Sequence, residues 1–347
     1  MAGRSSEMKP TVMLDNIRNQ PFSLGCVADH HFGEGAAGLQ AAAAAIRTAG
    51  RVVFTGMGSS MSAAIPAAYY LQSHGFAAEV VETSEWLHFG SAWPHPGAAV
   101  LVSRSGETVE IVKLLPRLDA AASPTIGVTN VRESQLAREC DHAIHINSEP
   151  DRMVAIQTYS GTVATLLLLA AAVLKEPAEQ WRSALDGTIT ALSNAVDEEM
   201  SRSEDWNEFL RSAEVVHLLG RGPSLASVRE GALLFNEAAR MPSAGLSCAL
   251  FRHGPVEIVD DRFRAIVFAS QAQTHEIDVA LAGDLERLGG KTRVYQAHGV
   301  PSPFEPIIEI VPMQIAACRL AEAKGIDPGD FRYATLVTLA ETGFERW

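Results

Sequence analysis

A run of hydroxyl side chains at residues 103–108 carries the clearest chemical signal in this chain. An apolar segment, Val100-Leu-Val102, leads into Ser103-Arg-Ser-Gly-Glu-Thr108, and a helical pattern follows. The hydroxyls of Ser103, Ser105 and Thr108 are therefore expected at a helix N-terminus, where unpaired backbone N–H groups and the helix dipole favour an anion. Hydroxyls bind a phosphate monoester without adding positive charge. The motif predicts a site for a sugar phosphate or a similar ester.

A second loop of the same kind, Gly56-Met-Gly-Ser-Ser60, directly follows the β-rich segment 51–55. Its glycines let the backbone approach a ligand, and Ser59 and Ser60 are expected to begin the next helix. The dinucleotide fingerprint is excluded because Met61 stands at its third glycine position. Helix capping explains this loop alone equally well. Two such loops on neighbouring strands, both open toward the carboxyl ends, favour a ligand site.

Short β-rich segments alternate with helical ones from residue 50 onward, which predicts an α/β fold with parallel sheets covered on both faces. In the first half, strands are expected at 51–55, 79–83, 98–102, 125–129 and 143–146, with helices that include 62–73 and 107–121. In the second half, strands are expected at 215–219, 265–269, 292–296 and 307–311, with helices at 224–240, 276–288 and 312–324. A helix over 13–20 is expected to stop at Pro21.

The repeated pattern predicts two related α/β units in tandem. The expected divisions are an N-terminal leader and helix (1–25), a first unit with the hydroxyl loops (26–180), a helical connector (181–205) and a second unit (206–347).

Composition limits the classes of function. The formal net charge of −13 argues against a nucleic-acid partner. The four cysteines are scattered without CxxC spacing, which indicates free thiols in a reducing compartment. The longest apolar run, 163–174, is shorter than the ~20 residues that span a bilayer, and His142 and His145 have no acid or cysteine at metal spacing. The sequence predicts a cytoplasmic protein with no membrane segment, metal or cofactor.

Taken together, the two loops resemble those of the sugar isomerase (SIS) domain family. The likeness covers nearly the whole chain, which resembles the tandem-SIS isomerase domain of glucosamine-6-phosphate synthase and stand-alone phosphosugar isomerases, deaminases and deglycases. The resemblance implies two tandem SIS domains, each a flavodoxin-like, doubly wound parallel sheet. Other matching motifs are Ile17-Arg-Asn-Gln-Pro21, Thr83-Ser-Glu85, Val154-Ala155 with Thr158, Glu230-Gly-Ala-Leu-Leu-Phe-Asn-Glu237 and His253-Gly-Pro255.

The resemblance implies a role for each matching residue. Glu237 falls on the base that moves a proton between sugar carbons 1 and 2, and His253 on the histidine that assists ring opening from the other subunit of a homodimer. The implied phosphate-binding residues are Ser59, Ser60, Ser103, Arg104, Ser105 and Thr108. The other implied substrate contacts are Gly58, Val154, Ala155 and Arg252.

The chemistry of the residues agrees with these roles. Aldose–ketose interconversion needs one base that removes and returns a proton, and a partly buried carboxylate suits that task. Histidine gives and takes a proton near neutral pH, as ring opening requires. On spacing alone, Glu237 would be a solvated glutamate on the helix face of Glu230, and His253 a structural turn residue.

Two departures from the family pattern leave the reaction open. Leucines at 234 and 336 stand where the synthase pattern has lysines, which removes cations that would stabilise a developing enolate. Arg104, Arg252 and Arg332 are candidate replacements. We also expect no glutaminase activity, because no N-terminal cysteine nucleophile precedes the first unit. The alternatives are a phosphosugar isomerase, with or without loss of ammonia, a fructosamine-6-phosphate deglycase type of enzyme, and a sugar-phosphate-binding protein without activity.

Overall fold

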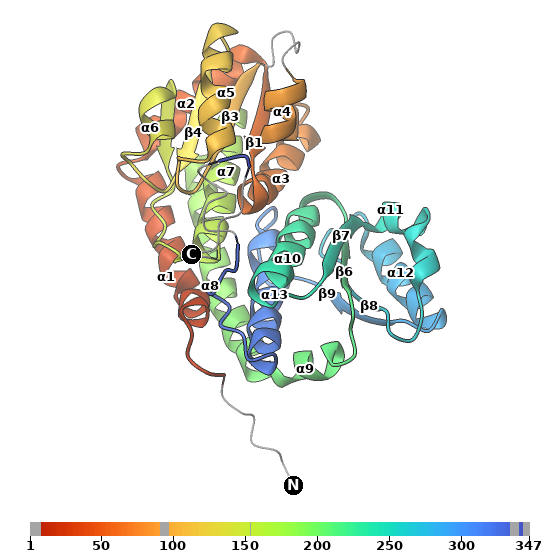
Figure 1. Ribbon diagram of the computed structural model, residues 1–347. Helices are drawn as coiled ribbons and strands as arrows, with labels where there is room; N and C mark the ends of the chain where they lie inside the picture. Colours follow the sequence, from red (N-terminus) through yellow and green to blue (C-terminus); the bar gives the residue numbers. More distant parts are fainter. Residues whose placement is uncertain (1–7, 91–96, 153, 334–339, 343–347) are drawn as a thin grey trace. The chain divides into compact units, whose positions relative to one another are not determined.

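The computed structural model describes residues 8–90, 97–152, 154–333 and 340–342. The chain divides into two compact units, each with one parallel sheet (Figure 1). The β1–β5 unit comprises Phe22–Pro150, Gln157–Asp186 and Phe331–Trp347, and the β6–β9 unit comprises Met1–Pro21, Asp151–Ile156 and Gly187–Asp330. The α/β fold with two parallel sheets is therefore confirmed, whereas the expected boundaries at 25, 180 and 205 stay a prediction.

The sheet of the β1–β5 unit has the order β2-β1-β3-β4-β5, and every neighbouring pair is parallel. Its strands are β1 (Arg51–Gly56), β2 (Ala77–Glu82), β3 (Ala98–Val102), β4 (Thr125–Thr129) and β5 (His142–His145). Its helices are α2 (Ala36–Ala49), α3 (Gly58–Ser73), α4 (Thr83–Phe89), α5 (Val109–Ala120), α6 (Gln135–Glu139) and α7 (Gln157–Leu174). Because helices cover the sheet, every residue of β3 and β4 is buried.

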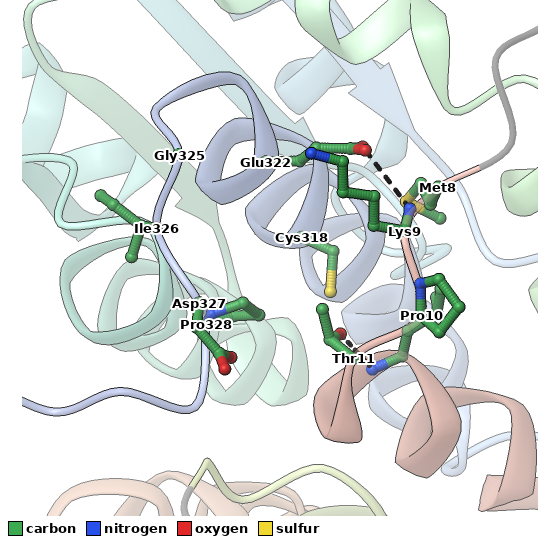
Figure 2. Close-up of a pocket in the computed structure, with 11 residues that line it drawn as sticks. Met8, Lys9, Pro10, Thr11, Cys318, Glu322, Gly325, Ile326, Asp327 and Pro328 are labelled. Carbon is green, nitrogen blue, oxygen red and sulfur yellow. Dashed lines mark hydrogen bonds between the residues drawn. The ribbon is translucent and has the colours of Figure 1, made fainter.

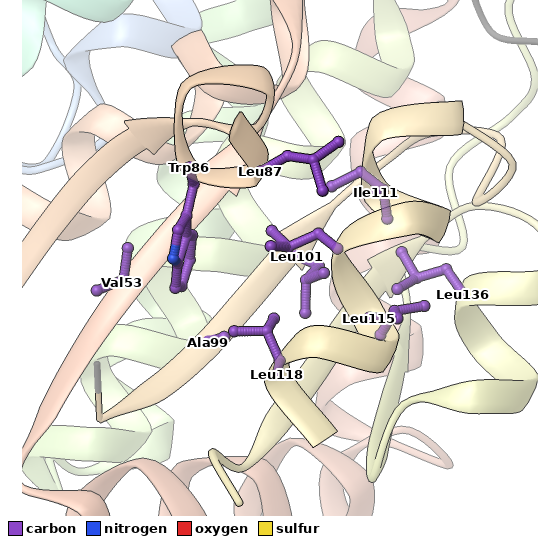
Figure 3. Close-up of a cluster of buried hydrophobic side chains, with 10 residues drawn as sticks. Val53, Trp86, Leu87, Ala99, Leu101, Ile111, Leu115, Leu118 and Leu136 are labelled. Carbon is purple, nitrogen blue, oxygen red and sulfur yellow. The ribbon is translucent and has the colours of Figure 1, made fainter. Parts of the chain in front are cut away.

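One face of this sheet carries a core cluster under α4, α5 and α6 (Figure 3). Trp86 of α4 and Ile111 of α5 pack with Leu101 of β3. Ile111, Leu115 and Leu118 follow a helical period, so α5 presents one apolar stripe to the sheet. This packing fixes α5, and with it the hydroxyl loop that ends at Thr108, the residue just before the helix.

The sheet of the β6–β9 unit has the order β7-β6-β8-β9, which repeats the order β2-β1-β3-β4 of the other sheet. Its strands are β6 (Val216–Gly220), β7 (Ser243–Ser247), β8 (Arg264–Phe268) and β9 (Lys291–Tyr295). Its helices are α9 (Glu204–Leu210), α10 (Leu225–Ala238), α11 (Cys248–Arg252), α12 (His275–Arg287) and α13 (Glu305–Ala323), with 3₁₀ turns η1 (Gly222–Ser224) and η2 (Pro255–Ile258). Helices α1 (Val12–Phe32) and α8 (Ala178–Ser201) contribute residues to both units.

Three expectations about the elements are wrong. Residues 307–311 were expected as a strand but form part of α13, where apolar β-branched side chains are buried around the whole helix. Pro21 does not end the first helix, because α1 continues through it to Phe32. Strand β7 was not expected: its residues Ser243-Ala-Gly-Leu-Ser247 have low strand propensity, and pairing with β6 imposes the extended conformation.

Helix α7 is, within the described residues, the one helix that is long and apolar enough to cross a membrane by length and composition alone. Of its 18-residue apolar window, 94% is buried inside the protein. That burial is typical of a core helix, in agreement with the short apolar run at 163–174.

A cluster of histidines lies in the core of the β1–β5 unit. His30 and His31 of α1 lie with ring centroids 5.1 Å apart, and His30 lies 5.8 Å from His145 of β5. His31 Nε2 lies 2.9 Å from the hydroxyl of Thr165, and its Nδ1 is buried without a hydrogen-bond partner. Burial lowers the pKa of His31 to about 3, with smaller contributions from His30 and His145. His31 is therefore a neutral core residue at pH 7.

We expect this imidazole to make the fold sensitive to acid. The unfolded chain protonates His31 near pH 6.5, whereas the folded chain does not until about pH 3, so stability is lost as the pH falls below 6.5. At pH 5 the cost from His31 is about 2 kcal/mol. Urea unfolding of a His31→Gln variant should lose about 2 kcal/mol less than wild type between pH 7 and pH 5.

Burial raises the pKa of Glu305 and Glu309, so these carboxyls make the protein more stable as the pH falls, opposite to His31. Both proteins share that contribution, so the difference between their unfolding free energies isolates the effect of His31. An exposed histidine, His298, supplies the matched control as His298→Gln. Identical pH profiles for wild type and His31→Gln would contradict the prediction.

Candidate functional site

The two hydroxyl loops meet at one edge of the β1–β5 sheet. They follow β1 and β3, which are parallel neighbours in a register that pairs Gly56 with Val102. Their carboxyl ends therefore lie side by side. This is also where the strand order reverses, since β2 lies beyond β1 on one side and β4 beyond β3 on the other. Open α/β sheets bind ligands at such switch points.

The loop after β1 is shaped by two glycines. A Cβ on Gly56 would lie 3.0 Å from both the backbone N of Met61 and the carbonyl O of Val102, so only glycine lets α3 begin this close to β3. Gly58 has φ +50° and is the first residue of α3. Ser59 and Ser60 follow it and are partly buried, so both lie in the first turn of the helix, as expected.

The loop after β3 is held by its own hydroxyls. Ser103 Oγ lies 2.8 Å from Thr108 Oγ1 and accepts a hydrogen bond of 3.0 Å from the N–H of Gly106. Ser105 Oγ accepts a bond of 3.3 Å from the N–H of Glu107. Thr108 is the N-cap residue of α5, yet its side chain makes no capping hydrogen bond. Capping alone therefore does not account for the threonine at this position.

Residues after β4 clamp the same loop from outside. The N–H of Asn130 donates to the carbonyl of Arg104, and the N–H of Leu136 donates to the carbonyl of Gly106, both at 3.0 Å. The hydroxyl of Thr129 also donates to the carbonyl of Arg104, at 3.2 Å. The sequence interpretation missed this clamp because its bonds go to backbone atoms, which leave no residue pattern. The loop is thus preorganised before any ligand arrives.

Gly106 is the tightest point of the loop, and its replacement gives a direct test. It has φ +67°, and an added Cβ would lie 2.1 Å from Ser134 Oγ. Gly75 has a similar φ of +79° but open space around it. Both alanine variants carry the left-handed backbone cost of about 1–2 kcal/mol, and Gly106→Ala also displaces the loop.

We expect Gly106→Ala to weaken sugar-phosphate binding at least about tenfold, because displaced hydroxyls no longer converge. Gly75→Ala should keep wild-type affinity at a comparable backbone cost. Calorimetric titration of both variants measures the difference, and equal affinities would show that the loop geometry does not matter for binding.

The residues implied in proton transfer belong to the β6–β9 unit. Glu237 is the penultimate residue of α10 and is partly buried, whereas Glu230 on the same helix is 1% exposed. His253 follows α11 directly and is exposed, with its N–H bonded to the carbonyl of Leu250 at 3.0 Å. Arg252, the last residue of α11, is exposed as well. Each side chain is thus accessible, as a group that touches a ligand must be.

Val154 and Ala155 lie in the segment Asp151–Ile156, which clusters with the β6–β9 unit. The carboxylate of Asp151 accepts a bond of 2.9 Å from the N–H of Ile156. Val154 is buried and lines a cavity of about 400 Å³ near the start of α1.

A second cavity, of about 260 Å³, lies between the residues before α1 and the end of α13 (Figure 2). Its wall includes Lys9, whose N–H donates to Glu322 at 3.3 Å, and Cys318. Burial raises the pKa of the Cys318 thiol to about 12. That thiol is therefore not a nucleophile at neutral pH.

The structure describes one of the two leucines that depart from the family pattern. Leu234 is completely buried in α10, so this position offers an apolar core contact and no charge. Leu336 lies outside the described residues. Arg332 is exposed, and Arg104 is partly buried within the hydroxyl loop. In the described parts of the chain, no group of three or more His, Cys, Asp or Glu side chains could hold a metal ion.

Comparison with known proteins finds a family match for the part of the chain that forms the β1–β5 sheet. The family model of the SIS domain matches residues 45–175, which include both hydroxyl loops. This part of the chain matches the SIS family. The chain is 28% identical over 298 residues to the glutamine–fructose-6-phosphate aminotransferase (isomerizing) of Pyrococcus horikoshii, a match that covers 80% of this chain and 50% of that protein. The chain thus spans about half the length of this curated relative.

Solved structures share the fold beyond the SIS domain itself. The C-terminal domain of glucosamine-fructose-6-phosphate aminotransferase from Francisella tularensis superposes with a TM-score of 0.83 at 18% identity, covering 95% of this chain and all of that one. The tagatose-6-phosphate ketose/aldose isomerase from Escherichia coli superposes with a TM-score of 0.73 at 20% identity, covering 92% and 95%. These superpositions establish the shared fold. At such low sequence identity they say nothing of the reaction, which has to be argued from the residues.

Proposed function

We propose that this protein is an isomerase of a hexose or amino-sugar 6-phosphate, acting in the cytoplasm as a homodimer built from two SIS domains per chain. The observation that carries the proposal is the convergence of hydroxyls at the switch point of the β1–β5 sheet, where the Thr108 side chain is not used as a helix cap. The ester phosphate is held there by Ser59, Ser60, Ser103, Arg104, Ser105 and Thr108.

The proton transfer follows from the remaining residues. Glu237 removes a proton from the carbon next to the carbonyl, the C–H electron pair forms the C1–C2 double bond, and the carbonyl π pair moves onto its oxygen. That oxygen takes up the proton of the neighbouring hydroxyl, whose oxygen becomes the new carbonyl in the second half of the reaction. Returning the proton to the neighbouring carbon completes the exchange of aldose and ketose. His253 assists ring opening from the partner subunit of the proposed dimer. Gly58, Val154, Ala155 and Arg252 contact the sugar. Where the sugar carries an amino group at carbon 2, the resulting ketimine can hydrolyse with release of ammonia.

A second candidate function is supported by Leu234. A buried leucine in place of a lysine removes one charge that would stabilise the enolate, so the chain is also a candidate for a protein that binds sugar phosphate without converting it. The deglycase alternative keeps the same phosphate site and splits an amine adduct.

Exchange with deuterated water separates these functions. Glucosamine 6-phosphate, fructose 6-phosphate and a fructosamine 6-phosphate are each incubated with the protein in D₂O and followed by NMR. An isomerase introduces deuterium at carbon 1 or 2 and forms the other sugar. Release of ammonia or of the free amine identifies the deaminase or the deglycase. Tight binding with no exchange for any of the three would overturn the proposed enzymatic activity.

A further inference from the structure

The switch point of the β6–β9 sheet repeats the glycine pattern of the first loop. β1 leads into Gly56-Met-Gly-Ser-Ser60, and β6 leads into Gly220-Arg-Gly-Pro-Ser224. The second glycine has φ +50° at Gly58 and +56° at Gly222. The backbone therefore turns the same way in both loops, and a serine follows each turn two residues later.

The second loop is repeated as well. Six residues join β3 to α5 (103–108), and six join β8 to α12 (269–274). Each loop ends in a threonine, Thr108 or Thr274, which is the N-cap of the following helix without a side-chain capping bond. The hydroxyl oxygen of Thr274 is buried and has no hydrogen-bond partner. A hydroxyl left in this state indicates a site built for an acceptor group.

A side chain of the protein already occupies this second edge. Glu309 of α13 is completely buried, and its two carboxyl oxygens accept bonds of 2.7 Å from the hydroxyls of Ser224 and Ser227. Ser270, in the loop after β8, is a third hydroxyl bonded to the same carboxyl. The cation of this edge is also engaged, because Arg221 Nε donates to Asp278 at 2.6 Å.

We propose that the β6–β9 sheet carries a second anion-binding site that is filled by the Glu309 carboxyl, which takes the place that an external phosphate takes in the other sheet. Hydroxyls from both loops converge on two oxygens of one planar group, as they would on two oxygens of a phosphate. The site is therefore closed to solution anions in the wild-type protein. Removing the Glu309 carboxyl opens it to inorganic phosphate.

Burying the Glu309 carboxyl is unfavourable, and the hydroxyls around it offset that desolvation as they would for a bound anion. Burial raises the pKa of Glu309, and the three serine hydroxyls oppose that rise by hydrogen bonding to the oxygens. Glu305, one turn earlier on α13, adds a second buried carboxyl whose Oε2 has no partner. A purely structural anchor would need neither this desolvation nor a repeat of the loop geometry.

Inorganic phosphate is the probe, and phosphorus NMR and calorimetric titration measure its binding at pH 8. The wild-type chain is expected to bind one phosphate, and Thr108→Ala should weaken that binding about tenfold or more. Glu309→Ala should bind a second phosphate that Thr108→Ala leaves unchanged and that Ser224→Ala weakens about tenfold or more. Glu309→Gln is the matched control, because its amide still fills the space and should admit no second phosphate.

The outcomes separate this inference from the proposed function. A wild-type protein whose phosphate binding is unchanged by Thr108→Ala, or that binds no phosphate, would count against the proposed sugar-phosphate site and leave the second site to be judged from Glu309→Ala. A folded Glu309→Ala protein, with wild-type circular dichroism and elution volume, that gains no phosphate would overturn the second site. So would a wild-type protein with a second phosphate that depends on Ser224, a measurement that holds even if Glu309→Ala fails to fold.

Discussion

Replacing Glu237 with glutamine is expected to lower turnover by about 10²–10⁴-fold, the usual contribution of a positioned general base. Glutamine keeps the size of the side chain and one accepting oxygen but cannot take up a proton. Since the proposed phosphate-binding hydroxyls belong to the β1–β5 unit and Glu237 does not, affinity for the sugar phosphate should change by less than about threefold. The effect should appear in kcat and in deuterium exchange at carbon 2, with KM almost unchanged.

The matched control is Glu257→Gln, which removes an exposed carboxylate from η2 in the same unit. It should retain wild-type turnover. If Glu237→Gln also retains wild-type turnover, Glu237 is not the base, and another carboxylate must be sought. If neither variant nor wild type exchanges deuterium, the chain binds its ligand without converting it.

The fold was predictable where local pattern and tertiary packing agree. Strands β3 and β4 fall at the expected residues because each is a short apolar run between polar turns, buried on both faces. The prediction of a strand at the start of α13 was wrong because Ile307-Ile-Glu-Ile-Val311 has the composition of a strand. Only burial of the whole helix selects the helical form. Strand β7 was not predicted for the opposite reason: its Ser, Ala and Gly residues have low strand propensity, so the sequence gives no indication of a strand there.

More of the site could be predicted from the sequence in the β1–β5 unit than in the β6–β9 unit. Ser103, Ser105 and Thr108 follow a strand at a spacing that can be seen in the sequence, and the structure places them together in one loop. The backbone clamp from Asn130 and the crowding at Gly106 could not be foreseen, because both depend on a neighbouring strand. Glu309 was missed for the same reason: its serine partners lie more than 80 residues away in the chain.

These observations assign the two sheets different tasks despite their shared strand order. In the β1–β5 sheet, the loop hydroxyls contact one another and the backbone, so an anion can still be added to them. In the β6–β9 sheet, the corresponding hydroxyls end on a carboxyl of the protein itself. Under the two proposals above, the same topology serves once for a ligand and once for internal cohesion, and the side chain at position 309 makes the difference.

The second large effect is expected at Thr108. Thr108→Val keeps the shape of the side chain and removes the hydroxyl, and Ser105→Ala removes the neighbouring one. Each should weaken binding of the sugar phosphate by about 1–3 kcal/mol, the cost of losing a hydrogen bond to a charged group. Since the Thr108 side chain makes no capping bond to α5, the free energy of unfolding should fall by less than about 1 kcal/mol. Calorimetric titration and urea unfolding measure the two quantities.

Two comparisons make the test specific to the phosphate. The same titration with the dephosphorylated sugar should show no difference between wild type and either variant. Thr48→Ala, which removes an exposed hydroxyl bonded only to Ala44 within α2, should leave both affinities unchanged. Because a hydroxyl that serves the helix acts on any ligand alike, equal losses for the phosphorylated and dephosphorylated sugars would assign Thr108 and Ser105 to the fold. A loss confined to the phosphorylated sugar would assign them to the ester oxygens.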